Sequence, residues 1–309
     1  MTPPNTSLGS GAEFDVIRAM LDIWGSVAQG IGDDAAVLTV PAGKHLVIST
    51  DTSVEDVHFR KGWLCARDIG ARATTAALSD LAAMGANADS ILVSMVVPQP
   101  WRDSLLDVAA GIKRSAVAAG ARIVGGNVSR GATFSLSLTV LGHSNAPVRR
   151  TGATPGDVLC VTGTFGGPQA AVAAFERGET PARWALDRFV APVARLSEGQ
   201  WLAKHGARAM IDISDGLGSD AQHLAAASKV TAVLESELIP RFPSVSAQQA
   251  LTAGEEYELL VALPERDAAR IAHEFTAQFA LPLTRVGHVV AANSPSRVEL
   301  GGGHDHFSR

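Results

Sequence analysis

Long hydrophobic runs and runs of positive charge are both missing from this 309-residue chain. Its best apolar stretch, Ile91–Val97, is interrupted by Ser94, and it falls well short of the ~20 residues that a membrane-spanning helix needs. The net charge is −5 and no basic run is longer than Arg149–Arg150, which leaves no electrostatic footprint for nucleic acid. Met1–Gly11 contains no apolar core of a secretion signal. We therefore predict a cytoplasmic protein that binds neither membranes nor nucleic acid.

Cysteine is scarce as well, with two residues in the whole chain. Cys65 and Cys160 lie far apart in apolar surroundings, which predicts two buried thiols in a reducing compartment. The sequence contains no HExxH motif, no CxxC pair and no GxSxG elbow. These absences exclude the commonest zinc, redox and α/β-hydrolase sites.

Glycine-containing stretches match known nucleotide-binding loops only in part. Gly43 and Lys44 are followed by His45 instead of serine or threonine, so they form no P-loop. Gly30–Ala35 fits the dinucleotide pattern G-x-G-x-x-A, but it contains two aspartates and precedes a predicted strand instead of a helix. Gly163–Gly167, between a predicted strand and a predicted helix, could bind an anion through its backbone amides or could be a flexible turn.

Length and composition predict two domains with large cores. Hydrophobic residues make up 46% of the chain and charged residues 18%, which is typical of a folded protein. A stretch rich in Gly, Pro and Arg, His143–Asp157, separates the two halves. We expect a flexible tail over residues 1–12, an N-terminal domain over 13–145 and a C-terminal domain over 146–309.

Hydrophobic periodicity predicts where the helices and strands lie. The predicted helices are Phe14–Trp24, Leu64–Met84, Arg102–Ala119, Pro168–Arg177, Ala194–His205, Leu217–Ala227 and Arg266–Phe279. The predicted strands are Ala35–Val40, His45–Ser49, Ser90–Val97, Ala121–Gly125, Thr133–Leu141, Val158–Thr162, Ala209–Ile213, Val230–Leu234, Tyr257–Leu263, Leu283–Val289 and Ser296–Leu300. Hairpin-like strand pairs occur beside helical crossovers, so the predicted fold class is α+β.

Acidic residues recur at strand ends, at a strand-to-helix junction and inside an apolar helix. They are Asp33, Asp34, Asp51, Asp80, Asp212, Asp215, Glu255 and Glu256. Two carboxylates about 4 Å apart repel by roughly 4 kcal/mol at an effective dielectric of about 20, so the aspartates would share one cleft only around a cation. Mg²⁺ fits because it binds carboxylates together with phosphate oxygens. The plainer alternatives are a turn at Asp33–Asp34 and a helix N-cap at Asp215.

Seven stretches of the chain, in order, resemble the motifs of thiamine-monophosphate kinases. They are Gly30–Leu38 (GIGDDAAVL), Ser49–Thr52 (STDT) with Val57–Phe59 (VHF), Leu78–Ala86 (LSDLAAMGA), Val124–Asn127 (VGGN), Arg150–Asp157 (RTGATPGD), Ile211–Leu217 (IDISDGL) and Gly254–Leu259 (GEEYEL). The similarity extends over nearly the whole chain, from Glu13 to Phe307.

The resemblance implies a two-domain fold shared with aminoimidazole ribonucleotide synthetase, which dimerises through its N-terminal sheets. It also implies transfer of the γ-phosphoryl group of ATP to thiamine monophosphate, assisted by several Mg²⁺ ions. The implied Mg²⁺ ligands are Asp34, Ser49, Thr50, Asp51, Asp80, Asn127, Asp212 and Asp215. The implied ATP-binding residues are Gly126, Asn127, Arg150 and Ser214, and those for thiamine phosphate are His58, Glu255 and His304.

The chemistry of the implied reaction demands positioning more than proton transfer. The acceptor oxygen belongs to a phosphate that is already anionic near neutral pH, so we expect no general base. Catalysis then consists of aligning two anions and neutralising their charge. Arg150 is the candidate for stabilising the charge that develops during transfer.

The sequence departs from the family pattern at several positions. Asparagine stands at Asn127, glutamate at Glu256 and glycine at Gly167, where the family commonly has aspartate. Asp56 replaces a frequent glycine, and His304 replaces a frequent aromatic residue. Two alternatives therefore stay open: another ATP-dependent synthetase or kinase of the same superfamily, and a non-catalytic nucleotide-binding scaffold.

Overall fold

The computed structural model describes residues 12–31 and 35–292, and the chain divides into two compact units. The first unit comprises Met1–Leu81 and Asn87–Asn145, and the second comprises Ala82–Ala86 and Ala146–Arg309. Both units combine helices with a β-sheet, which confirms the predicted α+β class. No helix in the described part of the chain is both long and apolar enough to cross a membrane.

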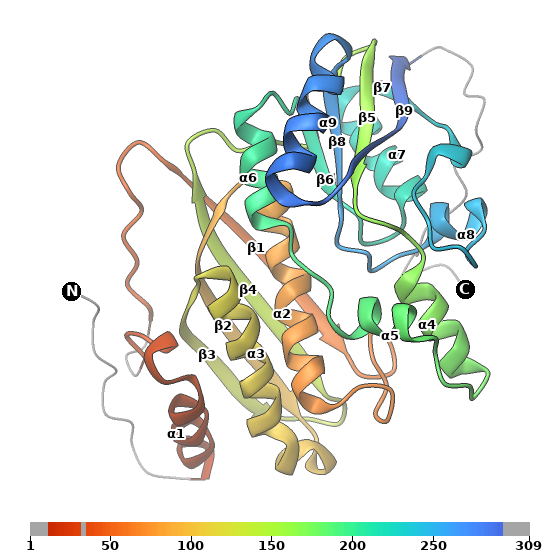
Figure 1. Ribbon diagram of the computed structural model, residues 1–309. Coiled ribbons are helices and arrows are strands. Elements are labelled where there is room, and N and C mark those ends of the chain that lie inside the picture. The colour runs from red at the N-terminus through yellow and green to blue at the C-terminus, as the bar shows by residue number, and fades with distance from the viewer. Residues whose placement is uncertain (1–11, 32–34, 293–309) are drawn as a thin grey trace. The chain divides into compact units, whose positions relative to one another are not determined.

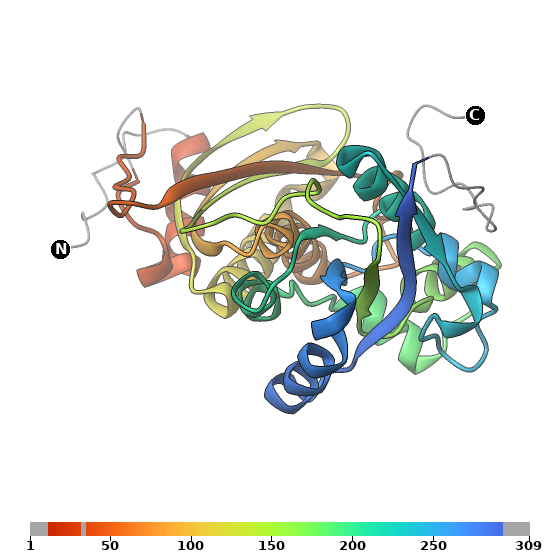
Figure 2. The ribbon, with the colours of Figure 1, turned by 90° about the horizontal axis from the view of Figure 1, so that it is seen from above.

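A four-stranded sheet in the order β1-β4-β2-β3 forms the centre of the first unit. Its strands are β1 (His45–Val54), β2 (Asn87–Val97), β3 (Arg122–Arg130) and β4 (Ser135–Ser144). β2 and β3 run parallel, and the other neighbouring pairs are antiparallel. The helices of this unit are α1 (Ala12–Trp24), α2 (Ala66–Ala83) and α3 (Leu105–Ala119), with short 3₁₀ turns at η1 (Gly25–Val27) and η2 (Gln99–Ser104). Helices α2 and α3 cover the same face of the sheet (Figures 1 and 2).

The two faces of this sheet differ because successive side chains of a strand point to opposite sides. Leu138 and Val140 of β4 are buried on the face that α2 and α3 cover. On the other face, Leu46 and Ile48 of β1 are 46% and 55% exposed. We call this second side, which also carries Thr50, the open face of the sheet.

The second unit contains a five-stranded antiparallel sheet in the order β6-β8-β5-β9-β7. Its strands are β5 (Asp157–Thr162), β6 (Ala209–Asp212), β7 (Val230–Leu234), β8 (Leu259–Pro264) and β9 (Leu283–Ala291). Its helices are α4 (Gly167–Glu176), α5 (Arg183–Val190), α6 (Leu196–Lys204), α7 (Leu217–Ser228), α8 (Ala247–Thr252) and α9 (Glu265–Phe279), with a 3₁₀ turn at η3 (Ser236–Leu238). Helix α7 and helix α9 pack against this sheet. The core includes Leu159, Val161 and Ile211, which are 0 to 1% exposed.

Several predicted elements differ from the observed ones. Ala35–Val40 forms no strand, because its apolar residues do not enter a core and Val37 is 90% exposed. β1 continues to Val54 instead of ending at Ser49. The short helices α5 and α8 were not predicted, and the predicted strand Ser296–Leu300 lies outside the described residues.

The prediction of two buried thiols is correct for one cysteine only. Cys160, in the central strand β5, is buried, and burial raises the pKa of its thiol to about 12. Cys65 is exposed and was wrongly predicted as buried. It precedes α2, where its thiol donates a hydrogen bond to the Asp68 carboxylate at 3.0 Å.

Two glycines allow α2 and α3 to pack unusually close together. A Cβ atom on Gly111 would lie 1.8 Å from the carbonyl oxygen of Arg67, and one on Gly70 would lie 2.2 Å from the carbonyl oxygen of Val108. Both distances are far shorter than a van der Waals contact. The helix pair that covers the sheet therefore requires glycine at both positions.

We expect Gly111→Ala to lower the free energy of unfolding by about 3 kcal/mol, because the added methyl group forces the helices apart. This cost exceeds the gain of about 1 kcal/mol in helix propensity. Urea denaturation followed by circular dichroism measures the difference. Val117→Ile is the control, because it adds one carbon at a residue of α3 that is 55% exposed. Equal stability of the two variants would contradict the close packing.

Candidate functional site

Two of the predicted motifs lie side by side in the second unit. The N–H of Glu255 donates to the carbonyl oxygen of Ser214 at 2.7 Å, and the N–H of Tyr257 donates to that of Ile213 at 2.9 Å. The N–H of Ile213 donates in turn to the carbonyl of Glu258 at 2.8 Å. This backbone pairing places Ser214, predicted to bind ATP, directly beside Glu255, predicted to bind thiamine phosphate.

The loop before α7 does not use Asp215 as a helix cap. The N-cap position of α7 is Gly216, which has φ 118° and makes no side-chain capping bond. A Cβ atom there would lie 3.0 Å from the carbonyl carbon of Thr252, so the turn needs glycine. The N-cap alternative for Asp215 is therefore wrong, and its carboxylate does not cap the helix.

A buried carboxylate that the sequence analysis did not single out, Asp220, holds this loop. It is 2% exposed and accepts hydrogen bonds from the N–H groups of Ser214 and Asp215, both at 3.1 Å. Burial raises the pKa of Asp220 to about 7, the charges of Asp212 and Asp215 act in the same direction, and the two N–H groups oppose them. The signal in the sequence was an acidic residue in the first turn of a helix that follows a Ser-Asp-Gly loop.

In the first unit, β1 and α2 bring predicted Mg²⁺ ligands together. The hydroxyl of Ser49 donates to the carboxylate of Asp80 at 2.5 Å. Asp51 lies two residues further along β1 and therefore on the same side of the strand as Ser49. Its carboxylate accepts the N–H of Thr52 at 2.7 Å. Oxygen atoms from three predicted ligands thus lie on the helix-covered face of the sheet.

Thr50 points to the open face instead, where its hydroxyl lies 3.1 Å from that of Thr139. Thr139 lines a pocket of about 850 Å³, together with Gly126, Asn127 and the apolar side of α1 that includes Trp24. A Cβ atom on Gly126 would lie 1.8 Å from a carbonyl oxygen of the neighbouring strand β2. The strand alternation thus directs the side chains of Thr50 and Asp51, adjacent in sequence, to opposite faces.

His58 lies in a turn that follows β1. Its Nδ1 accepts the N–H of Val54 at 3.1 Å, so the neutral ring carries its proton on Nε2. The next residue, Phe59, is buried and packs edge-on against Trp101 with ring centroids 5.9 Å apart. Asp56 adopts φ 65°, a left-handed conformation that glycine enters freely and aspartate tolerates. The turn is therefore compatible with aspartate where the family frequently has glycine.

The remaining predicted residues are dispersed or lie outside the described part of the chain. Arg150 belongs to the second unit, and its exposed side chain makes no hydrogen bond or ion pair with any described residue, while its carbonyl oxygen accepts the hydroxyl of Ser228 at 2.8 Å. Asp34 and His304 fall outside the described residues. Within residues 12–31 and 35–292, no three His, Cys, Asp or Glu side chains form a ready-made metal cluster.

The glycine-rich stretch Gly163–Gly167 donates a backbone N–H group to an acidic side chain of the protein itself. The N–H of Gly166 donates to the carboxylate of Glu256, which is 1% exposed. A Cβ atom on Gly163 would lie 2.3 Å from the carboxylate of Glu258. The loop between β5 and α4 therefore receives two buried carboxylates from the Gly254–Leu259 motif.

Two arginines compensate the buried charge of Glu258. Arg195 donates to both carboxylate oxygens of Glu258, at 2.8 and 2.6 Å, and Arg188 and Thr162 donate at 2.7 and 2.6 Å. Burial opposes ionisation, but these donors hold the pKa of Glu258 below its usual value. Glu256 is different, because burial raises its pKa to about 8 and Glu258 adds to the rise, against the opposing Gly166 N–H and Arg188.

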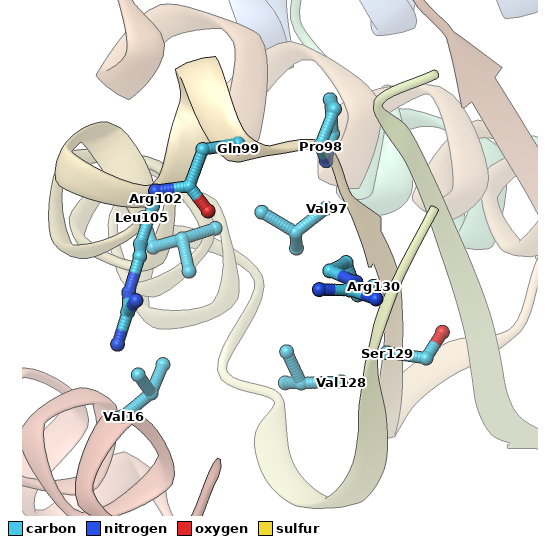
Figure 3. Close-up of a pocket in the computed structure, with 9 residues that line it drawn as sticks. All are labelled: Val16, Val97, Pro98, Gln99, Arg102, Leu105, Val128, Ser129 and Arg130. Atoms are coloured by element: carbon cyan, nitrogen blue, oxygen red, sulfur yellow. The ribbon is translucent and has the colours of Figure 1, made fainter. Parts of the chain in front are cut away.

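A second pocket in the first unit, of about 250 Å³, is lined by none of the predicted site residues (Figure 3). Val16 and Leu105 contribute to its apolar walls, and the guanidinium groups of Arg102 and Arg130 lie on opposite sides of it in the view of Figure 3. Neither arginine forms an ion pair with a described residue. Arg130 pairs in register with the buried Val97, so this pocket lies on the helix-covered side of the sheet, away from Thr139.

Two mixed units with acidic residues at strand ends define the class of protein. Residues 32–144 match the N-terminal domain of AIR synthase related proteins, and residues 154–298 match the C-terminal domain of the same proteins. The chain therefore belongs to the AIR synthase related protein family.

Within this family the chain is similar to thiamine-monophosphate kinases, which confirms the resemblance seen in the motifs. The enzyme of Salmonella typhimurium is 33% identical over 299 residues, covering 90% of this chain and 88% of that protein. The enzyme of Bacillus subtilis is 31% identical over 296 residues, covering 90% and 91%. The crystal structure of the enzyme from Stenotrophomonas maltophilia K279a matches with a TM-score of 0.80 at 30% identity over 96% of both chains. AaThiL complexed with AMPPCP and TMP matches with a TM-score of 0.76 at 28% identity, covering 97% of this chain and all of that one.

The raised pKa of Glu256 predicts how stability depends on pH. Between about 4.5, the usual pKa of the residue, and about 8, its value in the fold, the folded protein keeps a proton that the unfolded chain releases. The free energy of unfolding therefore falls as the pH rises through this interval. We expect Glu256→Gln to flatten this decline, measured as melting temperature from pH 5 to pH 8.

Glu274→Gln is the matched control for this experiment, because Glu274 is 42% exposed on α9. It should keep the wild-type decline. Part of the decline will persist in Glu256→Gln, because the pKa of Asp220 is raised to about 7. A pH profile of Glu256→Gln that is parallel to the wild type would contradict the prediction.

Proposed function

We propose that this protein transfers the γ-phosphoryl group of ATP to the phosphate of thiamine monophosphate, giving thiamine diphosphate and ADP. The observation that carries the proposal is the 2.7 Å hydrogen bond between Glu255 and Ser214, which joins the predicted acceptor and ATP positions. The similar enzymes are thiamine-monophosphate kinases, and AaThiL was solved with TMP and with AMPPCP, a non-hydrolysable analogue of ATP.

The side chains suit the two substrates. The acidic Glu255 is complementary to the positively charged thiazolium ring of thiamine, and Nε2–H of His58 can donate to a phosphate oxygen. Arg150, exposed and without an ion-pair partner among the described residues, is available for the charge of a phosphoryl group. Because the acceptor oxygen is already anionic, these residues need only bind and orient the two phosphates.

We propose Mg²⁺ as the metal that the acidic residues hold. The donors are all oxygen atoms, which a hard cation such as Mg²⁺ prefers. The proposed ligands in the first unit are Asp34, Ser49, Asp51 and Asp80, and those in the second unit, taken by itself, are Asp212 and Asp215. The side chain of Thr50 points to the open face, where Asn127 also lines the pocket, so these two predicted ligands are left out of this set. Asp212 and Asp215 also lie close enough to Asp220 for their charges to raise its pKa, although burial of Asp220 is the larger cause of that rise. Bound Mg²⁺ would supply charge neutralisation of the phosphates.

We further propose a cytoplasmic homodimer formed through the open face of the first sheet. Leu46 and Ile48 are large apolar residues that this face exposes to the extent of 46% and 55%. Burial of such residues against a second copy would remove apolar surface from water. Sedimentation velocity tests this arrangement: Ile48→Lys should shift the protein towards monomer, and an unchanged sedimentation coefficient would contradict it.

A product assay tests the proposed activity. Incubation of the protein with ATP, Mg²⁺ and thiamine monophosphate, followed by chromatography, should give thiamine diphosphate and ADP in equal amounts. Addition of excess EDTA should abolish the reaction. ADP with free phosphate and a different modified acceptor would point to another synthetase of the superfamily, and no turnover of ATP would point to a non-catalytic scaffold.

Within this reaction, we expect Asp51→Asn to lower kcat by more than about 100-fold, because it removes one negative charge from the proposed metal ligands. The melting temperature should stay close to that of the wild type. Asp107→Asn on α3 is the control, because Asp107 is 58% exposed and pairs with Arg67 on the surface. Turnover of Asp51→Asn near the wild-type level would remove Asp51 from the site.

A further inference from the structure

The segment that carries Glu255 has a strained backbone. Glu255 has φ 59° and Tyr257 has φ 52°, so two residues with side chains occupy the left-handed region within one short stretch. Such conformations persist only where the surrounding structure fixes them. The residue between them, Glu256, is the candidate for fixing this segment through its side chain.

The side chain of Glu256 anchors the segment to α4 and α5. Its carboxylate accepts the N–H of Gly166, at the N-terminus of α4. A guanidinium nitrogen of Arg188, from α5, lies 3.4 Å from the carbonyl oxygen of Glu256 and 3.7 Å from its carboxylate. Arg188 is itself fixed by Glu258, at 2.7 Å. The strained segment is therefore held by α4 and α5 in addition to its hydrogen bond with Ser214.

The contacts between Glu256 and Arg188 are not those that would give the greatest stability. One carboxylate oxygen of Glu256 and the Nε of Arg188 are buried without any hydrogen-bond partner, and buried polar atoms of this kind are costly. An apolar pair of similar size would fill the same space without that cost. A polar anchor at this position therefore calls for a role beyond packing.

We propose that Glu256 is a positioning residue, which fixes Glu255 in the orientation that binds the acceptor substrate by tying its segment to Gly166 and Arg188. This inference rests on the proposed function, in which Glu255 contacts thiamine monophosphate. Glu256 itself is 1% exposed, so we place it outside direct contact with the substrate. Its removal should therefore impair binding of the acceptor more than binding of ATP.

A pair of substitutions with matched volume separates the anchor from the packing. Glu256→Met fills the same space but cannot accept the N–H of Gly166, whereas Glu256→Gln keeps an acceptor oxygen. We expect Glu256→Met to raise the KM for thiamine monophosphate about tenfold while the KM for ATP stays within about twofold. Glu256→Gln should stay within about twofold of the wild type for both substrates.

Phe275→Leu controls for a loss of stability alone. Phe275 is fully buried on α9 of the same unit, and this variant should leave both KM values unchanged. If Glu256→Met changes both KM values equally, or leaves the KM for the acceptor unchanged, Glu256 is a structural residue and the inference is overturned. If Glu256→Met does not fold, Arg188→Gln loosens the same anchor from α5 and must show the same selective effect.

Hydrogen exchange provides a readout that does not depend on activity. The N–H groups of Glu255 and Tyr257 are hydrogen-bonded to Ser214 and Ile213, so they should exchange slowly in the wild type. Glu256→Met should accelerate their exchange, and Glu256→Gln and Phe275→Leu should not. If the wild type forms no thiamine diphosphate, the proposed function is wrong, and hydrogen exchange alone then tests whether Glu256 orders the segment. If exchange at Glu255 and Tyr257 is unchanged in Glu256→Met, Glu256 does not anchor the segment and the inference is overturned.

Discussion

Negative charge gathered into a small volume is the constraint on which the second unit depends. Asp220 is buried beside Asp212 and Asp215, and its pKa is raised to about 7. Backbone N–H groups of Ser214 and Asp215 compensate part of this charge from within the loop. Arg188 and Arg195 neutralise the negative charge of the buried Glu258 in the neighbouring segment. The loops that face the proposed substrates are thus shaped by the need to stabilise acids that have no direct role in the reaction.

Sequence periodicity predicted those elements whose hydrophobic pattern is complete. Helix α2 and helix α9 were predicted to within a few residues, because each presents a long apolar side to its sheet. Ala35–Val40 has a composition typical of a strand. A strand also needs a neighbouring strand to pair with, and hydrophobic periodicity does not predict whether one is present. The eight-residue helix α5 spans little more than two turns, so its hydrophobic pattern repeats at few positions. Local pattern is therefore reliable only where it extends over several turns or a whole strand.

The candidate site was predictable as a set of residues and not as an arrangement. The order of motifs identified Ser214 and Glu255, which the structure brings together through a backbone hydrogen bond. The motifs did not show that the side chains of Thr50 and Ser49 point to opposite faces of the sheet. That arrangement follows from the alternation of side chains along β1, which was predicted to end before Thr50. Asp220 was missed because its partners are backbone N–H groups, which no side-chain motif records.

Two departures from the family pattern that are far apart in sequence prove to be neighbours in the fold. A Cβ atom on Gly167 would lie 2.6 Å from Cβ of Arg188, so an aspartate there would displace the arginine. Glu256, longer by one methylene than the usual aspartate, reaches the N–H of Gly166 and lies 3.7 Å from the same arginine. Position 167 lies against the aliphatic part of Arg188 and Glu256 lies near its guanidinium group, so both positions adjoin the same arginine. Their effects on stability should therefore be coupled, because residues that share a partner do not contribute additively.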